Sequence, residues 1–177
     1  MPASGGKPHR ITFHPANDCC PSFSRDGQWV YFRSNRTGEG RVWKAPVAGG
    51  GAVQVTNNVG HVAFESPDGR YVYYTQTANT PSAFWRIPVS GGQPTKMLDG
   101  VVFRAFVVLE SGIYYIDQPS GEPRLQFFNF ATNRSITVAR NIGNIGPGLT
   151  ASPDGRTILY TRLDSSVDEL MLVENFR

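Results

Sequence analysis

The side chains that could do chemistry in this sequence are few and widely spaced. The histidines are His9, His14 and His61, and the cysteines are the adjacent pair Cys19 and Cys20. A catalytic histidine needs a nucleophile and an orienting acid in contact with it, and the spacing supplies neither. Adjacent cysteines bridge only with a strained geometry, and no second Cys or His pair stands at metal-ligand spacing. We therefore expect no catalytic residue, no metal and no cofactor.

Motifs of several large functional classes are absent from the sequence. It has no Gly-x-x-x-x-Gly-Lys-Ser/Thr phosphate loop, no Asp-rich calcium loop and no Gly-x-Ser-x-Gly nucleophile elbow. The net charge is +3 over 177 residues, which is too small to indicate a nucleic-acid partner. No apolar run is long enough for a membrane-spanning helix. The opening MPASGGKPHR lacks the apolar core of a signal peptide.

A repeat of 42 to 43 residues organises the chain. A turn dipeptide recurs at Asp26-Gly27, Asp68-Gly69, Ser111-Gly112 and Asp154-Gly155, and large apolar residues recur in phase at Trp43, Trp85, Phe127 and Leu170. The aspartate can cap such a turn through its side chain, and the glycine accepts a positive φ. We assign structural turns to Asp26, Gly27, Asp68, Gly69, Asp154 and Gly155.

Each repeat reads as four short strands. In the first repeat, SFSRDGQWVYFRS places two strands around the turn, RVWKAPV is a third strand and AVQVT is a fourth. Four strands per repeat indicate the blade of a β-propeller, and no segment has the 3.6-residue period of a helix. We predict an all-β single domain over 1–177, a propeller of about four four-stranded antiparallel blades. The repeats are placed at about 21–58, 59–101, 102–143 and 144–176.

The two ends of the chain are expected to complete each other. Segment 7–12 matches the fourth strand of a repeat, and the ending ELMLVENFR matches a third strand that has no fourth. Pairing of strand 7–12 with the last repeat would close the ring and give a monomer. The alternative is an arc of a larger propeller, whose open faces would invite homo-oligomers.

Several segments resemble a known repeat. SPDGRYVYYTQ, SPDGRTILYTR and FWRIPVSGGQPTKM resemble the WD40-like repeat of TolB-like β-propellers, and the ending DELMLVENFR is similar to the C-terminal portion of that family. The resemblance implies a bacterial, often periplasmic, propeller that binds proteins, although no signal peptide is visible in this chain. The same repeat occurs in the propeller of prolyl-oligopeptidase-type enzymes, where it gates a separate hydrolase domain.

Recognition is expected at the face that carries the loops between second and third strands, such as 34–40, and at the channel mouth. Loops on a rigid scaffold are where binding usually resides, and arginines there suit acidic groups. The candidate partner-binding residues are Arg33, Arg36, His61, Phe103, Arg104 and Arg162.

The function predicted from these patterns is a non-catalytic scaffold that binds a protein or peptide through its loop face and central channel. One alternative is the non-catalytic propeller of a prolyl-oligopeptidase-type enzyme. The other is a propeller that binds a small molecule or sugar.

Overall fold

The fold is all-β, as predicted. A computed structural model describes residues 5–78, 81–152 and 154–164. Within these residues the one helical element is a short 3-10 turn, η1 (Pro119–Gly121). The strands are β1 (Asp18–Phe23), β2 (Trp29–Thr37), β3 (Glu39–Pro46), β4 (Val53–Gln54), β5 (Ala63–Glu65), β6 (Tyr71–Thr75), β7 (Ser82–Pro88), β8 (Thr95–Val108), β9 (Gly112–Asp117), β10 (Arg124–Asn129), β11 (Arg134–Ala139), β12 (Ile145–Ala151) and β13 (Ile158–Arg162).

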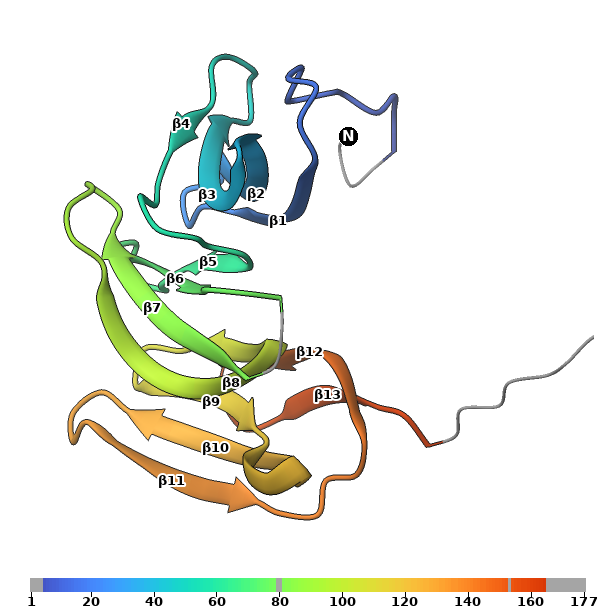
Figure 1. Cartoon of the computed structure of the whole chain (residues 1–177), viewed down its shortest axis with the longest axis vertical. Coiled ribbons are helices and arrows are strands. Elements are labelled where there is room, and N and C mark those ends of the chain that lie inside the picture. Colours follow the sequence, from blue (N-terminus) through green and yellow to red (C-terminus); the bar gives the residue numbers. More distant parts are fainter. Residues whose placement is uncertain (1–4, 79–80, 153, 165–177) are drawn as a thin grey trace, which may run out of the picture.

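These strands form antiparallel sheets that follow one another around an arc (Figure 1). Strands β1 to β4 form one sheet, β5 to β11 a second, and β12 and β13 a third. The second sheet is continuous because β8 pairs with β7 up to Val101 and with β9 from Val101 onward. We call β1–β4 blade 1, β5–β7 with the first part of β8 blade 2, the rest of β8 with β9–β11 blade 3, and β12–β13 blade 4.

The aspartate-glycine turns have the geometry that their residue types favour. Asp68 Oδ1 accepts hydrogen bonds from the Ser66 hydroxyl at 2.6 Å and from the Arg70 backbone N–H at 3.1 Å, and Gly69 has φ +69°. The bond from Ser66, followed by those from Arg70, lowers the pKa of Asp68 to about 2. Asp26-Gly27 and Asp154-Gly155 form equivalent turns.

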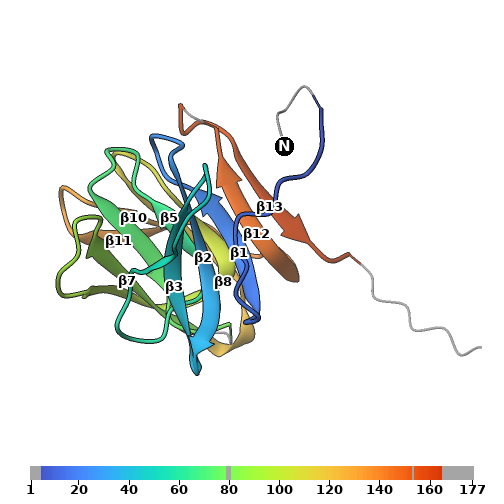
Figure 2. The same cartoon turned by 90° about the horizontal axis from the view of Figure 1, so that it is seen from above.

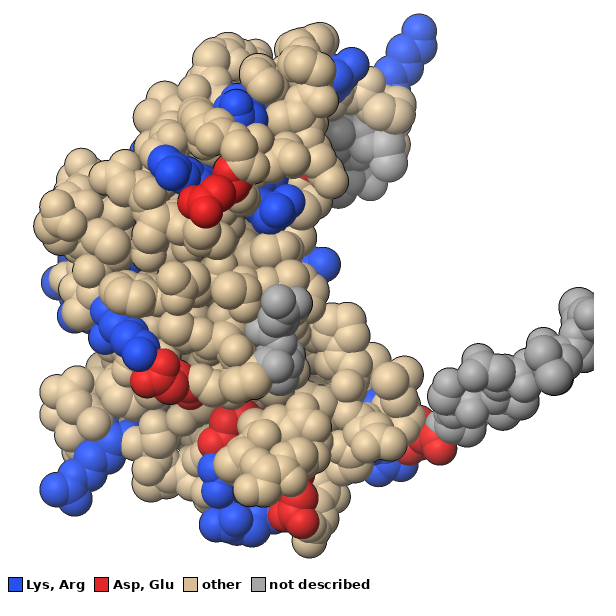
Figure 3. Space-filling view, in the orientation of Figure 1, with Lys and Arg blue, Asp and Glu red and all other residues tan. Residues whose placement is uncertain are grey.

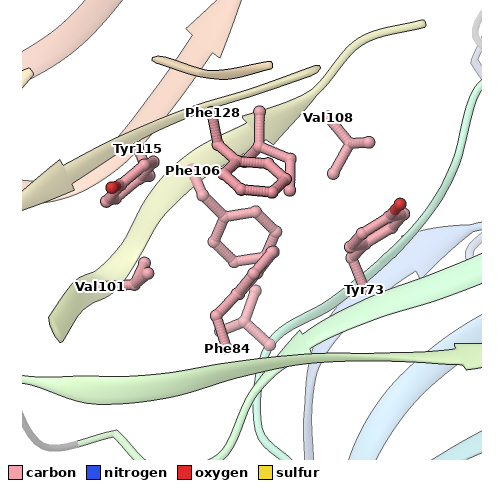
Figure 4. Packing of buried hydrophobic residues seen from close by; sticks show 9 residues of the cluster. Tyr73, Phe84, Val101, Phe106, Val108, Tyr115 and Phe128 are labelled. Carbon is pink, nitrogen blue, oxygen red and sulfur yellow. The ribbon is translucent and has the colours of Figure 1, made fainter. Parts of the chain in front are cut away.

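Apolar side chains from neighbouring blades pack face to face. Between blades 2 and 3, Phe84 lies edge-on to Phe106 with ring centroids 4.6 Å apart and is stacked on Tyr73 at 5.8 Å (Figure 4). Phe84 is completely buried. Similar clusters join blade 1 to blade 2 and blade 3 to blade 4. Because an inner blade is covered on both faces, its strands lack the polar-apolar alternation of a half-exposed sheet.

The structure does not show the predicted pairing of strand 7–12 with the last repeat. Residues 7–12 form no strand, and blade 4 contains only β12 and β13 among the described residues. The N-terminal segment lies against blade 1, where Ile11 shares a cavity of about 230 Å³ with Val30 and Phe32. Figure 2 shows this segment overlapping β13, but Figure 1 separates the two at opposite ends of the arc.

The described residues therefore form an open arc with a C-shaped outline (Figure 3). Neither a closed ring nor a count of four complete blades is confirmed. The predicted third strand of the last repeat, in 165–176, lies outside the described residues. Ile11 is half-buried and faces Val30 and Phe32 of blade 1, and burial of apolar surface favours such a contact.

The predicted loop at 34–40 is wrong in its extent. Strand β2 continues to Thr37 and β3 begins at Glu39, so Gly38 with φ +99° forms a tight connection between two long strands. This extension carries Arg36 within a strand instead of a loop.

Candidate functional site

The concave edge of the arc is built from the inner strands, and two of these strands are irregular where they face it. The pairing of β1 with β2 shifts register between Cys19 and Ser22, and Cys20 has φ +58°. The pairing of β8 with β9 shifts between Val101 and Phe106, and Arg104 has φ +59°. Such bulges redirect side chains and are frequent beside functional sites. A left-handed backbone at a residue other than glycine costs about 1–2 kcal/mol, so the surrounding structure must hold it.

Side chains from three blades meet at this edge. The Cys20 sulfur of β1 lies 3.9 Å from His61 Nδ1, which stands just before β5. The His61 ring lies edge-on to Phe103 of β8, with ring centroids 5.1 Å apart at 86°. The Cys20 thiol also donates to the Cys19 sulfur at 3.4 Å. The structure thus brings together two predicted residues, His61 and Phe103, with a cysteine pair that had no predicted binding role.

Two arginines determine the electrostatics of this cluster. Burial, and then the charges of Arg33 and Arg104, lowers the pKa of His61. Burial and the neighbouring Cys19 raise the pKa of Cys20 to about 11, although the same two arginines oppose that rise. Cys20 is therefore a neutral thiol at neutral pH and a weak nucleophile. The cluster therefore offers no thiolate at Cys20 near neutral pH.

Arg33 and Arg104 have no acidic partner within the described residues. Neither takes part in an ion pair found there, and the buried Arg33 Nε has no hydrogen-bond acceptor. The Arg33 guanidinium lies over Gly40, where a Cβ atom would come within 2.4 Å of Nε. Glycine at position 40 therefore makes room for the cation. Because a buried donor without an acceptor is costly, Arg33 is suited to receive an anionic group.

The other two predicted arginines are held by acidic residues. Arg36 pairs with Asp18 at 3.1 Å and donates to the Ser34 hydroxyl at 2.9 Å. Burial raises the pKa of Asp18, but its hydrogen bonds with Ser34, Thr12 and Arg36 outweigh this and hold the pKa below its ordinary value. Arg162 pairs with Asp164 at the surface of β13. Neither Arg36 nor Arg162 therefore joins the cluster of Cys20, His61, Phe103, Arg33 and Arg104, which we call the channel-mouth cluster.

No set of three or more His, Cys, Asp or Glu side chains is arranged to hold a metal ion in the part of the chain that the structure describes. The same residues contain no helix with the length and apolarity needed to cross a bilayer.

Because His61 is partly buried and lies near two arginines, we predict that it loses its proton at a lower pH than a free histidine does. We expect the pKa of His61 to lie below the 6.5 of a free histidine, and Arg104→Gln to raise it by removing a positive charge. The unfolded chain then binds a proton at higher pH than the folded chain, so the stability from neutral His61 is present above about pH 6.5 and is lost as the pH falls below it. Histidine NMR titration measures the pKa directly. Arg162→Gln is the control, and a His61 pKa at or above 6.5 contradicts the description.

Comparisons with known proteins agree with this geometry at the level of the fold. No protein-family model matches the sequence. TolB from Acinetobacter baumannii is similar with a TM-score of 0.69 and 21% identity, over 86% of this chain and 39% of that chain. A TolB-type protein from Agrobacterium tumefaciens gives 0.69 at 18% identity, over 92% and 65% of the two chains. The chain has a TolB-like β-propeller fold. The predicted resemblance is confirmed in this respect.

Other similarities are shorter or weaker. An uncharacterized protein of Agrobacterium fabrum is 33% identical over 58 residues, which is 33% of this chain and 20% of that protein. A puromycin-hydrolysing peptidase from Mycobacterium tuberculosis has a TM-score of 0.56 at 13% identity, over 89% of this chain and 28% of the peptidase. The chain thus spans a fifth of its curated relative and less than two thirds of each TolB-type structure.

Proposed function

We propose that this TolB-like propeller is a non-catalytic scaffold that binds a protein or peptide at the channel mouth, and that Arg33 and Arg104 receive an acidic group of the partner. The observation that carries the proposal is a pair of arginines that both act on His61 and have no acidic partner among the described residues. Charge-assisted hydrogen bonds from a guanidinium to a carboxylate are among the stronger polar contacts in proteins. Phe103 and His61 add ring surface beside them.

A matched pair of peptides tests this proposal. Binding of a Glu-Gly repeat peptide with a neutral fluorescent label is measured by anisotropy, and the Gln-Gly peptide serves as the uncharged probe. We expect the Glu peptide to bind and Arg104→Gln to weaken its binding about tenfold, because a hydrogen bond to a charged group is lost. Arg162→Gln is the control, since its arginine already pairs with Asp164. Equal binding of both peptides, or equal effects of the two substitutions, rejects the proposal.

Similarity to the peptidase from Mycobacterium tuberculosis favours the second candidate, a non-catalytic propeller that gates an enzyme domain. In that case the acidic group belongs to a substrate or to the enzyme domain, and the channel mouth controls access. The Glu peptide then competes with the substrate for entry into the channel and does not form a stable complex. The dissociation rate of the labelled peptide separates the two candidates, because a scaffold retains its partner and a gate releases it.

A further inference from the structure

One cavity between two blades lies away from the channel mouth. It has a volume of about 570 Å³ and opens between blades 2 and 3, beside the turn that ends β5. His61 precedes β5 and Ser66 follows it, so the cavity and the channel-mouth cluster lie at opposite ends of this inner strand. A volume of this size falls within the range of about 300–1,000 Å³ for small-molecule sites. Its lining includes Tyr71, Tyr73, Arg86, Met97, Glu110 and Phe130.

The preceding junction, between blades 1 and 2, has the same construction. Lys44 lies over the ring of Trp29 at 4.8 Å, as Arg86 lies over the ring of Tyr71 at 4.5 Å. The repeat spacing of 42 residues relates Lys44 to Arg86, Trp29 to Tyr71 and Tyr31 to Tyr73. Each junction therefore presents a cationic side chain over an aromatic ring, with a tyrosine on the same strand as that ring.

The residue that ends the inner strand beside the tyrosine differs in charge between the junctions. Glu65 pairs with Val72 across the β5–β6 hairpin, and Val108 pairs with Ile113 across the β8–β9 hairpin, each next to the turn. Val108 thus occupies in blade 3 the position of Glu65 in blade 2.

The carboxylate of Glu65 is part of the first junction. Its Oε2 accepts a hydrogen bond from the Tyr31 hydroxyl at 2.8 Å, and its Oε1 accepts one from the Arg25 backbone N–H at 3.2 Å. The cavity at that junction is smaller, at about 310 Å³.

Among the residues that the structure describes, no carboxylate takes this place beside the tyrosine of the second junction. Val108 packs in the same apolar cluster as Tyr73 (Figure 4). Arg86 and Tyr73 line the cavity together, and Arg86 pairs with no carboxylate among the described residues. A cation and a phenol thus face the cavity without the acid that the repeat supplies one blade earlier.

We propose that the cavity between blades 2 and 3 binds a monocarboxylate with an apolar body, and that its carboxylate lies beside Tyr73 and Arg86 as Glu65 lies beside Tyr31. The Tyr73 hydroxyl and the Arg86 guanidinium donate to the ligand's oxygens. Tyr71, Met97 and Phe130 supply the apolar wall for its body.

The remaining charges limit the ligand to a single negative charge. Arg70 is already paired with Asp68 at 2.6 Å, so it offers no second free cation. Glu110 also lines the cavity and repels additional negative charge. Multiply charged anions such as phosphate esters are therefore disfavoured.

Two sources share this chemistry, a small apolar acid and the C-terminal carboxylate of a peptide. The probes are 4-phenylbutyrate and an acetylated tripeptide ending in phenylalanine, each compared with its amide by NMR titration of the full chain. We expect the acids to bind and the amides to bind at least about tenfold more weakly, because the charge-assisted bonds are lost. Binding of 4-phenylbutyrate alone assigns the site to small acids, and binding of the tripeptide assigns it to peptide termini.

Variants locate the site. Arg86→Gln should weaken binding about tenfold, whereas the matched control Lys44→Gln at the first junction should leave it unchanged. Val108→Glu should block the site by supplying the internal carboxylate. Since Val108 is buried and this variant could fail to fold, Tyr73→Phe is the second variant, with a several-fold loss expected. Binding of neither acid, equal binding of acids and amides, or equal effects of Arg86→Gln and Lys44→Gln overturns the proposal.

Discussion

Replacement of Phe84 by alanine is expected to lower the free energy of unfolding by about 3–5 kcal/mol. Phe84 has no exposed surface, and its ring contacts Phe106 and Tyr73 where blades 2 and 3 meet. The substitution removes the transfer free energy of a buried ring and leaves a cavity that a close-packed interface fills only in part. Chemical denaturation followed by tryptophan fluorescence measures the change.

Phe23→Ala is the control for this prediction. Phe23 is 67% exposed, and surface substitutions usually change stability by about 0.5 kcal/mol or less. A loss below about 1 kcal/mol for Phe84→Ala, or similar losses for the two variants, would mean that blades 2 and 3 do not pack as described.

Asp117→Ala should cost about 2–3 kcal/mol of stability, because it leaves charged and polar donors without their acceptor. The Asp117 carboxylate accepts two bonds from Arg124, at 3.0 and 2.6 Å, and two weaker bonds from Gln126. The side chains of Asp117 and Arg124 are 17% and 26% exposed, so water replaces the lost bonds only in part. Asp117 ends β9 and its donors Arg124 and Gln126 belong to β10, so the lost bonds connect these two neighbouring strands of blade 3.

Asp164→Ala provides the contrast. The ion pair of Asp164 with Arg162 has both side chains more than half exposed, and such pairs are worth about 0–1 kcal/mol. Thermal unfolding of the two variants tests the difference. Equal losses would show that the Asp117 network is solvated and adds no more than a surface pair.

The order of strands and turns could be predicted because the residues that form each turn lie next to one another in the sequence. Each repeat carries its own turn residues, and the hairpins at Asp26, Asp68 and Asp154 depend only on a few neighbouring residues. The position of segment 7–12 could not be predicted in the same way. Its pattern fits a strand, but which surface it covers depends on competition between distant parts of the chain.

The channel-mouth cluster was predicted only in part. His61 stands just before β5, and Phe103 lies where the long strand β8 passes into blade 3; the repeat phase places both positions at the inner strands. The sequence held one signal for the unusual backbone of Cys20. Cys20 stands four residues before Ser24, and the residue four before Ser152 in the last repeat is a glycine, Gly148. Gly148 also has a positive φ, of +121°.

The predicted roles of the arginines depended on acids that the sequence could not place. Asp18 is 18 residues from Arg36 in sequence, yet it pairs with Arg36 across β1 and β2. Asp164 is two residues from Arg162 and pairs with it locally. Arg33 and Arg104 lack such neighbours in the described part of the chain, and only the arrangement of three blades shows that they act on the same histidine.

Consecutive repeats stack face to face, so that their inner strands form one concave surface. Proton NOE spectroscopy between the rings of His61 and Phe103 tests this stacking, because these rings belong to adjacent blades and lie edge to face at 5.1 Å. The described structure predicts strong cross-peaks between the two rings. A folded protein in which Phe103 shows cross-peaks only to residues of its own repeat would contradict it.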